Sequence, residues 1–127
     1  MSARILVIED NPQNMYLMRF LLGSHGFEVV EARDGAEGIR LTRKMLPAVI
    51  LLDIQLPLMD GYAVAAALRR EPLLAAVPII AVTSYAMVGD RERVLAAGAT
   101  DYIEKPINPD IFVDQVRRHL TGPREAP

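Results

Sequence analysis

Four strand-like segments of this sequence each end in polar residues that can bind a cation or a phosphoryl group. The segments are residues 4–8, 48–52, 79–82 and 101–104. The polar residues that follow them are Glu9 and Asp10, then Asp53, then Thr83 and Ser84, then Lys105. Ligands of open parallel sheets bind beyond the carboxyl ends of the strands. If the four strands are neighbours, their carboxylates, hydroxyls and ammonium group suit one hard cation and one phosphoryl group.

Each of these signals has a simpler explanation when it is taken alone. The acid pair suits a solvated loop, Asp53 suits a helix or turn cap, and Thr83 suits the cap of the next helix. Lys105 would ordinarily extend its ammonium group into solvent. The peptide bond between Lys105 and the proline that follows can be cis, which would direct the lysine back over the end of the sheet. Four such signals at consecutive strand ends favour one shared site.

Composition bounds the class of protein. The chain has 127 residues, which predicts one domain, and it has no cysteine. Its 14 basic and 16 acidic residues give a formal net charge of −2, without the clustered basic face of a nucleic-acid binder. No apolar stretch approaches the ~20 residues that span a bilayer, and the N-terminus has no signal-peptide layout. We therefore expect a cytoplasmic domain without direct nucleic-acid binding or membrane insertion.

Strand-like and helix-like segments alternate five times, a pattern that predicts a parallel α/β sheet. Besides the four segments above, residues 28–32 form a short mixed strand that is typical of a sheet edge. The expected helices follow Asn11, Asp34 and Asp60, run from about residue 86 to residue 97, and run from Pro109 to near Leu120. Asn-Pro at 11–12 and again at 108–109 predicts an asparagine cap with proline at the first helical position.

Five motifs, in order along the chain, carry a resemblance to a known family. They are Ile8-Glu9-Asp10-Asn11, Asp53-Ile54-Gln55-Leu56-Pro57 with Met59-Asp60-Gly61, Val82-Thr83-Ser84, Gly98-Ala99-Thr100-Asp101-Tyr102, and Lys105-Pro106. Over about residues 3–120 the sequence resembles the receiver domain of two-component response regulators, in the CheY-like superfamily. Within that family it is similar to single-domain receivers of cell-cycle control.

The resemblance implies both a fold and a domain organisation. The fold would be flavodoxin-like, (βα)5, with a doubly wound five-stranded parallel sheet in the order 2-1-3-4-5 between two helical layers. A receiver domain would span residues 1–122, followed by a flexible tail over residues 123–127 and no output domain.

The resemblance also implies roles at the strand ends. Asp53 would accept a phosphoryl group from phosphohistidine, Lys105 would pair with the phosphoryl oxygens, and Thr83 would hydrogen-bond one of them. Tyr102 would swing inward when Thr83 moves, so that these two residues form the switch. Phosphoryl transfer depends on positioning and charge neutralisation, which matches this set of side chains.

Mg²⁺ or Mn²⁺ is the implied cofactor. The implied ligands are Asp10, Asp53, the backbone carbonyl of Gln55, and Glu9 either directly or through water. Glu9 stands where aspartate is the usual residue of the family, so its extra methylene makes its direct contact with the metal the least certain. Binding is expected to weaken in acid as the carboxylates become protonated.

Partner surfaces are expected on two helices. Asn14 and Met15 would contact a histidine-bearing partner near the acid pair. The signalling face would combine the helix after Ser84 with Tyr102 and the last helix. Met87, Val88 and Arg91 would contribute to it, whereas Val94 is expected in the core.

The leading hypothesis is a single-domain response regulator that is switched by phosphorylation. Its partners would be a histidine kinase or histidine phosphotransferase and a downstream protein target. A weak homodimer is also compatible with this hypothesis. One alternative is a phosphoryl carrier in a hybrid histidine kinase pathway, and another is a binding module that is not phosphorylated. A hydrolase with an aspartyl-phosphate intermediate is disfavoured, because Gln55 stands where such enzymes place a second acid. We therefore expect no turnover of a separate substrate.

Overall fold

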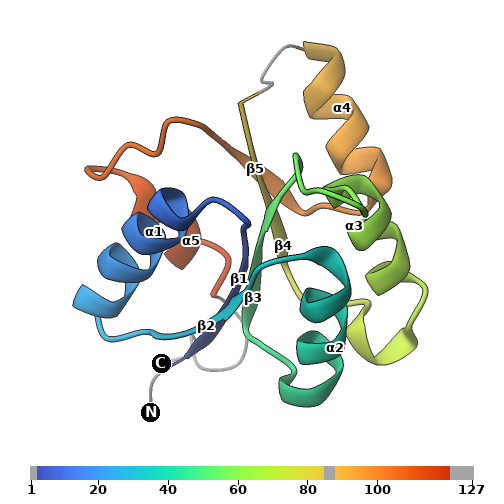
Figure 1. Cartoon of the computed structure of the whole chain (residues 1–127), viewed down its shortest axis with the longest axis horizontal. Coiled ribbons are helices and arrows are strands. Elements are labelled where there is room, and N and C mark those ends of the chain that lie inside the picture. Colours follow the sequence, from blue (N-terminus) through green and yellow to red (C-terminus); the bar gives the residue numbers. More distant parts are fainter. Residues whose placement is uncertain (1–2, 85–87, 121–127) are drawn as a thin grey trace.

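The computed structural model describes residues 3–84 and 88–120 and contains one parallel five-stranded sheet (Figure 1). The strands are β1 (Arg4–Ile8), β2 (Glu28–Ala32), β3 (Val49–Asp53), β4 (Ile79–Thr83) and β5 (Asp101–Glu104). Their order is β2-β1-β3-β4-β5, so β1 and β3 are neighbours and β2 is an edge strand. The predicted flavodoxin-like fold and strand order are confirmed.

Helices cover both faces of the sheet. They are α1 (Pro12–Ser24), α2 (Gly35–Met45), α3 (Gly61–Arg69), α4 (Val88–Ala97) and α5 (Phe112–Arg117), with a short 3-10 helix, η1, over Pro72–Leu74. Helices α1 and α5 lie on one face, and α2, α3 and α4 lie on the other (Figure 1). Within the described ranges, no helix is long and apolar enough to cross a membrane.

Alternate strand residues face the two helical layers, which explains the continuous apolar runs of the sequence. On β1, Ile5 and Val7 belong to the core beneath α1 and α5, whereas Leu6 and Ile8 belong to the core beneath α2 and α3. Both cores are made mainly of buried aliphatic side chains, and the core beneath α1 and α5 also contains Phe112. The sheet is therefore a fixed platform for whatever follows its strands.

Three helices begin at the predicted polar caps. Asn11 Oδ1 accepts hydrogen bonds from the N–H groups of Gln13 and Asn14, at 2.9 and 3.0 Å. Asp34 Oδ1 accepts from Glu37 N–H at 2.8 Å, and Asp60 Oδ1 accepts from Ala63 N–H at 3.0 Å. These caps satisfy N–H groups that have no partner inside their helix, and they fix where each helix starts.

The last helix starts later than predicted. Asn108 Oδ1 accepts from Asp110 N–H at 3.0 Å, and the Asn108 carbonyl accepts from both Ile111 and Phe112. The shared carbonyl makes a tight turn, so regular helix begins at Phe112 rather than at Pro109. Bonds of the i to i−3 type at His119 and Leu120 end the helix at Arg117. The predicted start of α4 near residue 86 lies outside the described residues.

Candidate functional site

The two acidic residues after β1 differ in exposure. The side chain of Glu9 is buried, whereas Asp10 is exposed. Glu9 N–H donates to the carbonyl of Ala32 at 3.0 Å, which extends the pairing of β1 with β2. Glu9 Oε2 accepts a hydrogen bond from Asn11 N–H at 3.1 Å. The sheet and the start of α1 together therefore hold the Glu9 carboxylate inside the protein.

Asp53 is the last residue of β3 and is only 2% exposed. It lies opposite Val82 in the sheet, and the next N–H along the chain, that of Ile54, donates to the Val82 carbonyl at 3.1 Å. Asp53 Oδ1 accepts from Gln55 N–H at 3.0 Å. The carboxylate is thus positioned by regular sheet pairing and by the first turn of the loop that follows.

Gly61 holds the start of α3 against the backbone of Asp53. Its N–H donates to the Ile54 carbonyl at 3.0 Å. A Cβ atom at position 61 would lie 2.6 Å from Ile54 Cα and 2.7 Å from the Asp53 carbonyl oxygen. Both distances are too short for carbon, so only glycine allows this approach.

Lys105 brings a positive charge to the same end of the sheet. Its N–H donates to the Thr83 carbonyl at 2.8 Å, and its peptide bond to Pro106 is cis. Lys105 Nζ lies 3.3 Å from Asp53 Oδ1, to which it donates a hydrogen bond, and 3.3 Å from Glu9 Oε1. The ammonium group is largely buried between two buried carboxylates, where an ion pair is screened far less than at the surface.

The acidic cluster fits a divalent cation. Glu9, Asp10 and Asp53 each place one carboxylate oxygen within 4.8 Å of the others. With all three ionised and Lys105 protonated, the local charge is −3 + 1 = −2. Glu9 Oε1 is buried and has no hydrogen-bond partner in the described part of the chain, although Lys105 lies within ion-pair distance. Oxygen donors with excess negative charge are what Mg²⁺ prefers in proteins.

The pKa of Glu9 reflects its burial and the excess negative charge of the cluster. The pKa of Glu9 is raised from 4.5 to about 7, and this rise is caused chiefly by burial and next by repulsion from the Asp53 carboxylate. The hydrogen bond from Asn11 and the charge of Lys105 act in the opposite direction without cancelling it. Near neutral pH, Glu9 therefore holds a proton for part of the time unless a cation binds.

Thr83 completes the group of side chains that the sequence predicted to meet. It is the last residue of β4, is 2% exposed and lies opposite Glu104 of β5. The structure therefore places all the predicted acids, the hydroxyl and the ammonium group at the carboxyl end of one sheet. Their chemical roles are taken up under the proposed function.

Comparison with known proteins identifies the family. Residues 5–117 match the model of the response regulator receiver domain. The chain is 39% identical over 120 residues to the polar-differentiation response regulator DivK of Brucella ovis. The aligned residues cover 94% of this chain and 98% of that protein. The chain belongs to the response regulator receiver family.

Solved receiver structures agree with this assignment. The receiver domain of a sensor histidine kinase from Pseudomonas aeruginosa PAO1, with a magnesium ion coordinated in its active site cleft, is 35% identical with a TM-score of 0.87. The alignment covers 94% of this chain and 98% of that one. The Vibrio cholerae chemotaxis protein CheY4 is 27% identical with a TM-score of 0.88, over 93% and 98% of the two chains.

Membership of the receiver family establishes the general function of the chain in signalling. Receiver domains bind Mg²⁺ at an acidic site, and they act as signalling switches rather than as enzymes that turn over a separate substrate. They interact with histidine kinases or phosphotransfer proteins and with downstream targets. This receiver domain is therefore a phosphorelay signalling module.

Tyr102 lies between the receiver's site and its surface. It is half-buried on β5, and the guanidinium carbon of Arg91 on α4 lies 4.9 Å from its ring centroid. Tyr102 packs with Tyr62 against a small core cluster that contains Ile54, the residue after Asp53, and Val94. A continuous packed path thus joins the residue after Asp53 to α4. The prediction that Val94 lies in the core is confirmed.

One predicted surface residue is corrected. Met15 is 2% exposed and packs with Met18 and Leu22 in the core beneath α1, so its side chain cannot contact a partner. Asn14 is partly exposed and remains a candidate contact. Met87 and the side chain of Val88 lie outside the described residues. Arg91 is exposed apart from its contact with Tyr102.

Two contacts near the site were not predicted from the sequence. The side-chain carbonyl of Gln55 accepts from Ser84 N–H at 3.3 Å, which ties the loop after β3 to the end of β4. The stack of Arg91 on Tyr102 was also not foreseen. Neither contact has a local pattern, because each joins residues that are distant in sequence.

Proposed function

We propose that this receiver domain accepts a phosphoryl group from phosphohistidine onto Asp53 in a magnesium-dependent reaction. The observation that carries the proposal is the position of Lys105 Nζ, 3.3 Å from an oxygen of Asp53 and 3.3 Å from one of Glu9. An ammonium group held against a buried carboxylate is placed to neutralise the oxygens of an incoming phosphoryl group.

In the proposed transfer, a carboxylate oxygen of Asp53 attacks the phosphorus atom of the phosphohistidine. The new P–O bond forms as the P–N bond breaks, and the electron pair of that bond stays on the imidazole nitrogen, which takes up a proton. Asp53 becomes an acyl phosphate, and the partner's histidine is restored. Lys105 and the Thr83 hydroxyl pair with phosphoryl oxygens in this proposal.

The residues proposed to hold Mg²⁺ or Mn²⁺ are Asp10, Asp53 and the backbone carbonyl of Gln55, with Glu9 acting directly or through water. The bound cation supplies positive charge that offsets the charge of the transferring group. The raised pKa of Glu9 means that this carboxyl group must lose its remaining proton before it can act as a ligand.

Switching is proposed to follow the packed path from Asp53 to α4. Thr83 would move toward the phosphoryl group, and Tyr102 would move inward in response. Phosphorylation shifts such an equilibrium only by as much as its interactions with the two conformations differ. We propose that the exposed side of α4 and β5 then presents a changed surface to a downstream target.

A second candidate is the role of phosphoryl carrier in a hybrid histidine kinase pathway. It is favoured by the similarity to the receiver of a sensor histidine kinase, at 35% identity. Both candidates use the same chemistry on Asp53, and they differ in whether the phosphoryl group is passed on to a histidine phosphotransferase.

The test is labelling by acetyl phosphate or a phosphohistidine protein, with and without Mg²⁺, read by intact mass. We expect labelling that requires Mg²⁺ and disappears in Asp53→Asn. Asp114→Asn is the matched control, because Asp114 is an exposed residue of α5, and it should label normally. Labelling that persists in Asp53→Asn would refute the assignment. Onward transfer to a histidine phosphotransferase would favour the carrier role.

A further inference from the structure

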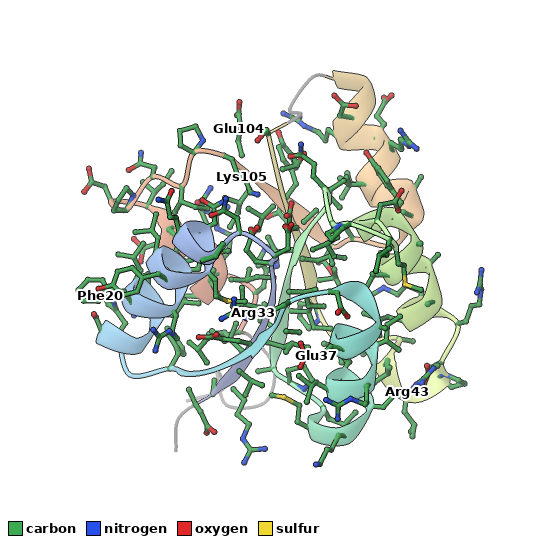
Figure 2. All side chains as sticks on the ribbon, viewed as in Figure 1. Phe20, Arg33, Glu37, Arg43, Glu104 and Lys105 are labelled. Atoms are coloured by element: carbon green, nitrogen blue, oxygen red, sulfur yellow. The ribbon has the colours of Figure 1, made fainter. Side chains whose placement is uncertain are left out.

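Two aromatic side chains lie on the solvent side of α1. Tyr16 is 59% exposed and Phe20 is 56% exposed. Their rings are stacked, with centroids 6.1 Å apart and an interplanar angle of 18°. Figure 2 shows Phe20 on the outer side of α1, away from the sheet. The two rings therefore form a continuous aromatic surface that is exposed on α1 and is not part of the core.

A shallow hollow lies beside these rings. It has a volume of about 380 Å³ and is lined by Tyr16, Arg19, Phe20, Gly23 and Ser24. A Cβ atom at Gly23 would meet nothing within 4 Å, so no neighbour in the chain requires glycine there. The left-handed residue after the helix is Gly26, with φ 88°, so Gly23 is not needed for that turn either. The missing side chain of Gly23 therefore leaves open space beside the two rings.

We propose that the stripe formed by Tyr16, Phe20 and Gly23 binds the same stripe of a second copy of this chain. The three positions follow i, i+4, i+7 spacing and lie on one side of the helix. In an antiparallel pair related by a two-fold axis between Arg19 and Phe20, the Tyr16 ring of each copy lies opposite Gly23 of the other. The two Phe20 side chains then lie side by side next to the axis. The large-to-small order makes the stripe self-complementary, as an isologous contact requires.

The charges beside the stripe are compatible with this pairing. Arg19 Nε lies 2.9 Å from Glu31 Oε2, and the Arg19 guanidinium lies 5.9 Å from the Tyr16 ring centroid. Because the arginine is already paired within its own chain, a second copy meets no uncompensated like charge. Depletion of unpaired charge is typical of the centre of a protein interface.

The area of the stripe predicts a weak, transient dimer. An aromatic side chain buries about 150–250 Å² when it is fully covered. Since nearly half of each ring is already covered, the two rings offer roughly 200 Å² per copy. The total is well below the ~1,200 Å² of stable interfaces, so association should require concentrations on the order of 0.1–1 mM.

The test is sedimentation velocity over a concentration series, without magnesium and without a phosphodonor, so that its outcome is separate from that of the proposed phosphotransfer. We expect reversible dimerisation of the natural chain. Phe20→Glu and Phe20→Lys should each weaken it at least about tenfold, because like charges would then face each other at the two-fold axis. A 1:1 mixture of the two variants should dimerise again, since opposite charges then meet.

Leu73→Glu is the matched control, because Leu73 is 85% exposed and lies in η1, away from α1. Its dimerisation should equal that of the natural chain, and circular dichroism should confirm the fold of every variant. A natural chain that stays monomeric would overturn the proposal. So would a mixture of the two Phe20 variants that fails to associate, since it would exclude the two-fold geometry. A loss of association in Leu73→Glu would place the contact elsewhere and overturn it as well.

Discussion

Arg69 and Lys105 are two partly buried cations at opposite ends of the sheet, and their surroundings differ in kind. Arg69, at the end of α3, lies near the amino ends of β4 and β5, and all five acceptors that it contacts are neutral. They are the carbonyls of Leu74, Ala75, Val77 and Gly98 and the hydroxyl of Thr100, at 2.8–3.2 Å. Lys105, at the carboxyl ends of the strands, faces two buried carboxylates at 3.3 Å.

This difference separates a structural contact from the site at which we propose phosphotransfer. The planar guanidinium of Arg69 matches several fixed acceptors at once and joins the segment before β4 to the loop before β5, so its surroundings are complete without a ligand. The ammonium group of Lys105 is a single charge among three carboxylates, so its surroundings remain negative until a cation binds. A titratable site with unbalanced charge is the kind of place where proteins carry out chemistry.

The largest effect that we predict is on phosphotransfer at the Lys105 end. Lys105→Met should lower the labelling rate of Asp53 by about 100-fold to 1,000-fold, because it removes a charge that stabilises the transferring group. The measurement is the rate of labelling at saturating Mg²⁺. Arg69→Met is the control and should label at the natural rate below its melting temperature. Equal losses of labelling rate in the two variants would contradict the distinction between the two ends of the sheet.

The next effect is a pH dependence of stability caused by Glu9. Its pKa is about 7 in the folded protein and 4.5 in the unfolded chain, so the folded state binds more protons between these values. Without metal, the free energy of unfolding should therefore fall by on the order of 3 kcal/mol as pH rises from below 4.5 to above 7.

Denaturant unfolding at a series of pH values checks this prediction. Glu9→Gln should remove most of the pH dependence, because the amide does not titrate. Glu28→Gln, at the exposed pair with Arg4, is the matched control and should keep it. A Glu9→Gln protein with the natural pH dependence would show that Glu9 is not the group responsible.

A smaller loss of stability is expected at the Arg69 end. Arg69→Met should lower the free energy of unfolding by about 2 kcal/mol, because it leaves partly buried carbonyls without a donor. Arg69→Lys should recover only part of that loss, since one ammonium group cannot reach all the acceptors on the segments before β4 and β5. Urea unfolding at a fixed pH measures both. Full recovery by lysine would mean that charge, rather than the forked geometry, accounts for the effect.

The smallest effect concerns an exposed arginine, Arg91. Arg91→Ala removes the stack on Tyr102 and should cost less than about 1 kcal/mol of stability. Its clearer consequence should be a changed NMR signal of the Tyr102 ring. Arg93→Ala is the matched control, because Arg93 stacks on Tyr62 at 4.1 Å instead. If Arg93→Ala perturbs the Tyr102 signal as strongly, the contact with Arg91 is not what sets that ring's environment.

The sequence predicts the Lys105 end of the molecule far better than the Arg69 end. Strand ends are visible as apolar runs followed by polar residues, and parallel pairing then brings Asp53, Thr83 and Lys105 together without further information. Helix caps such as Asn11 are local, so they too can be read directly. Arg69 has no such pattern, since it is one of two adjacent arginines and four of its five acceptors are backbone carbonyls in the segments before β4 and β5.

Two other features were beyond sequence reasoning for physical reasons. The pKa of Glu9 depends on how deeply its side chain is buried, and neighbouring Asp10 is exposed although the two residues look alike in the sequence. The late start of α5 depends on competition between hydrogen bonds at the Asn108 carbonyl. Such competition is decided by tertiary packing rather than by the Asn-Pro pair itself.

Gly61 has a consequence for genetics. A Cβ atom there would collide with the carbonyl oxygen of Asp53, so any substitution must displace the residue proposed to carry the phosphoryl group. In a screen for signalling-defective alleles, changes at position 61 should therefore cluster with those at Asp53, although glycine has no side chain to take part in the reaction. Signalling would then depend on a residue that contributes no side chain to the site and leaves the space that the backbone of Asp53 requires.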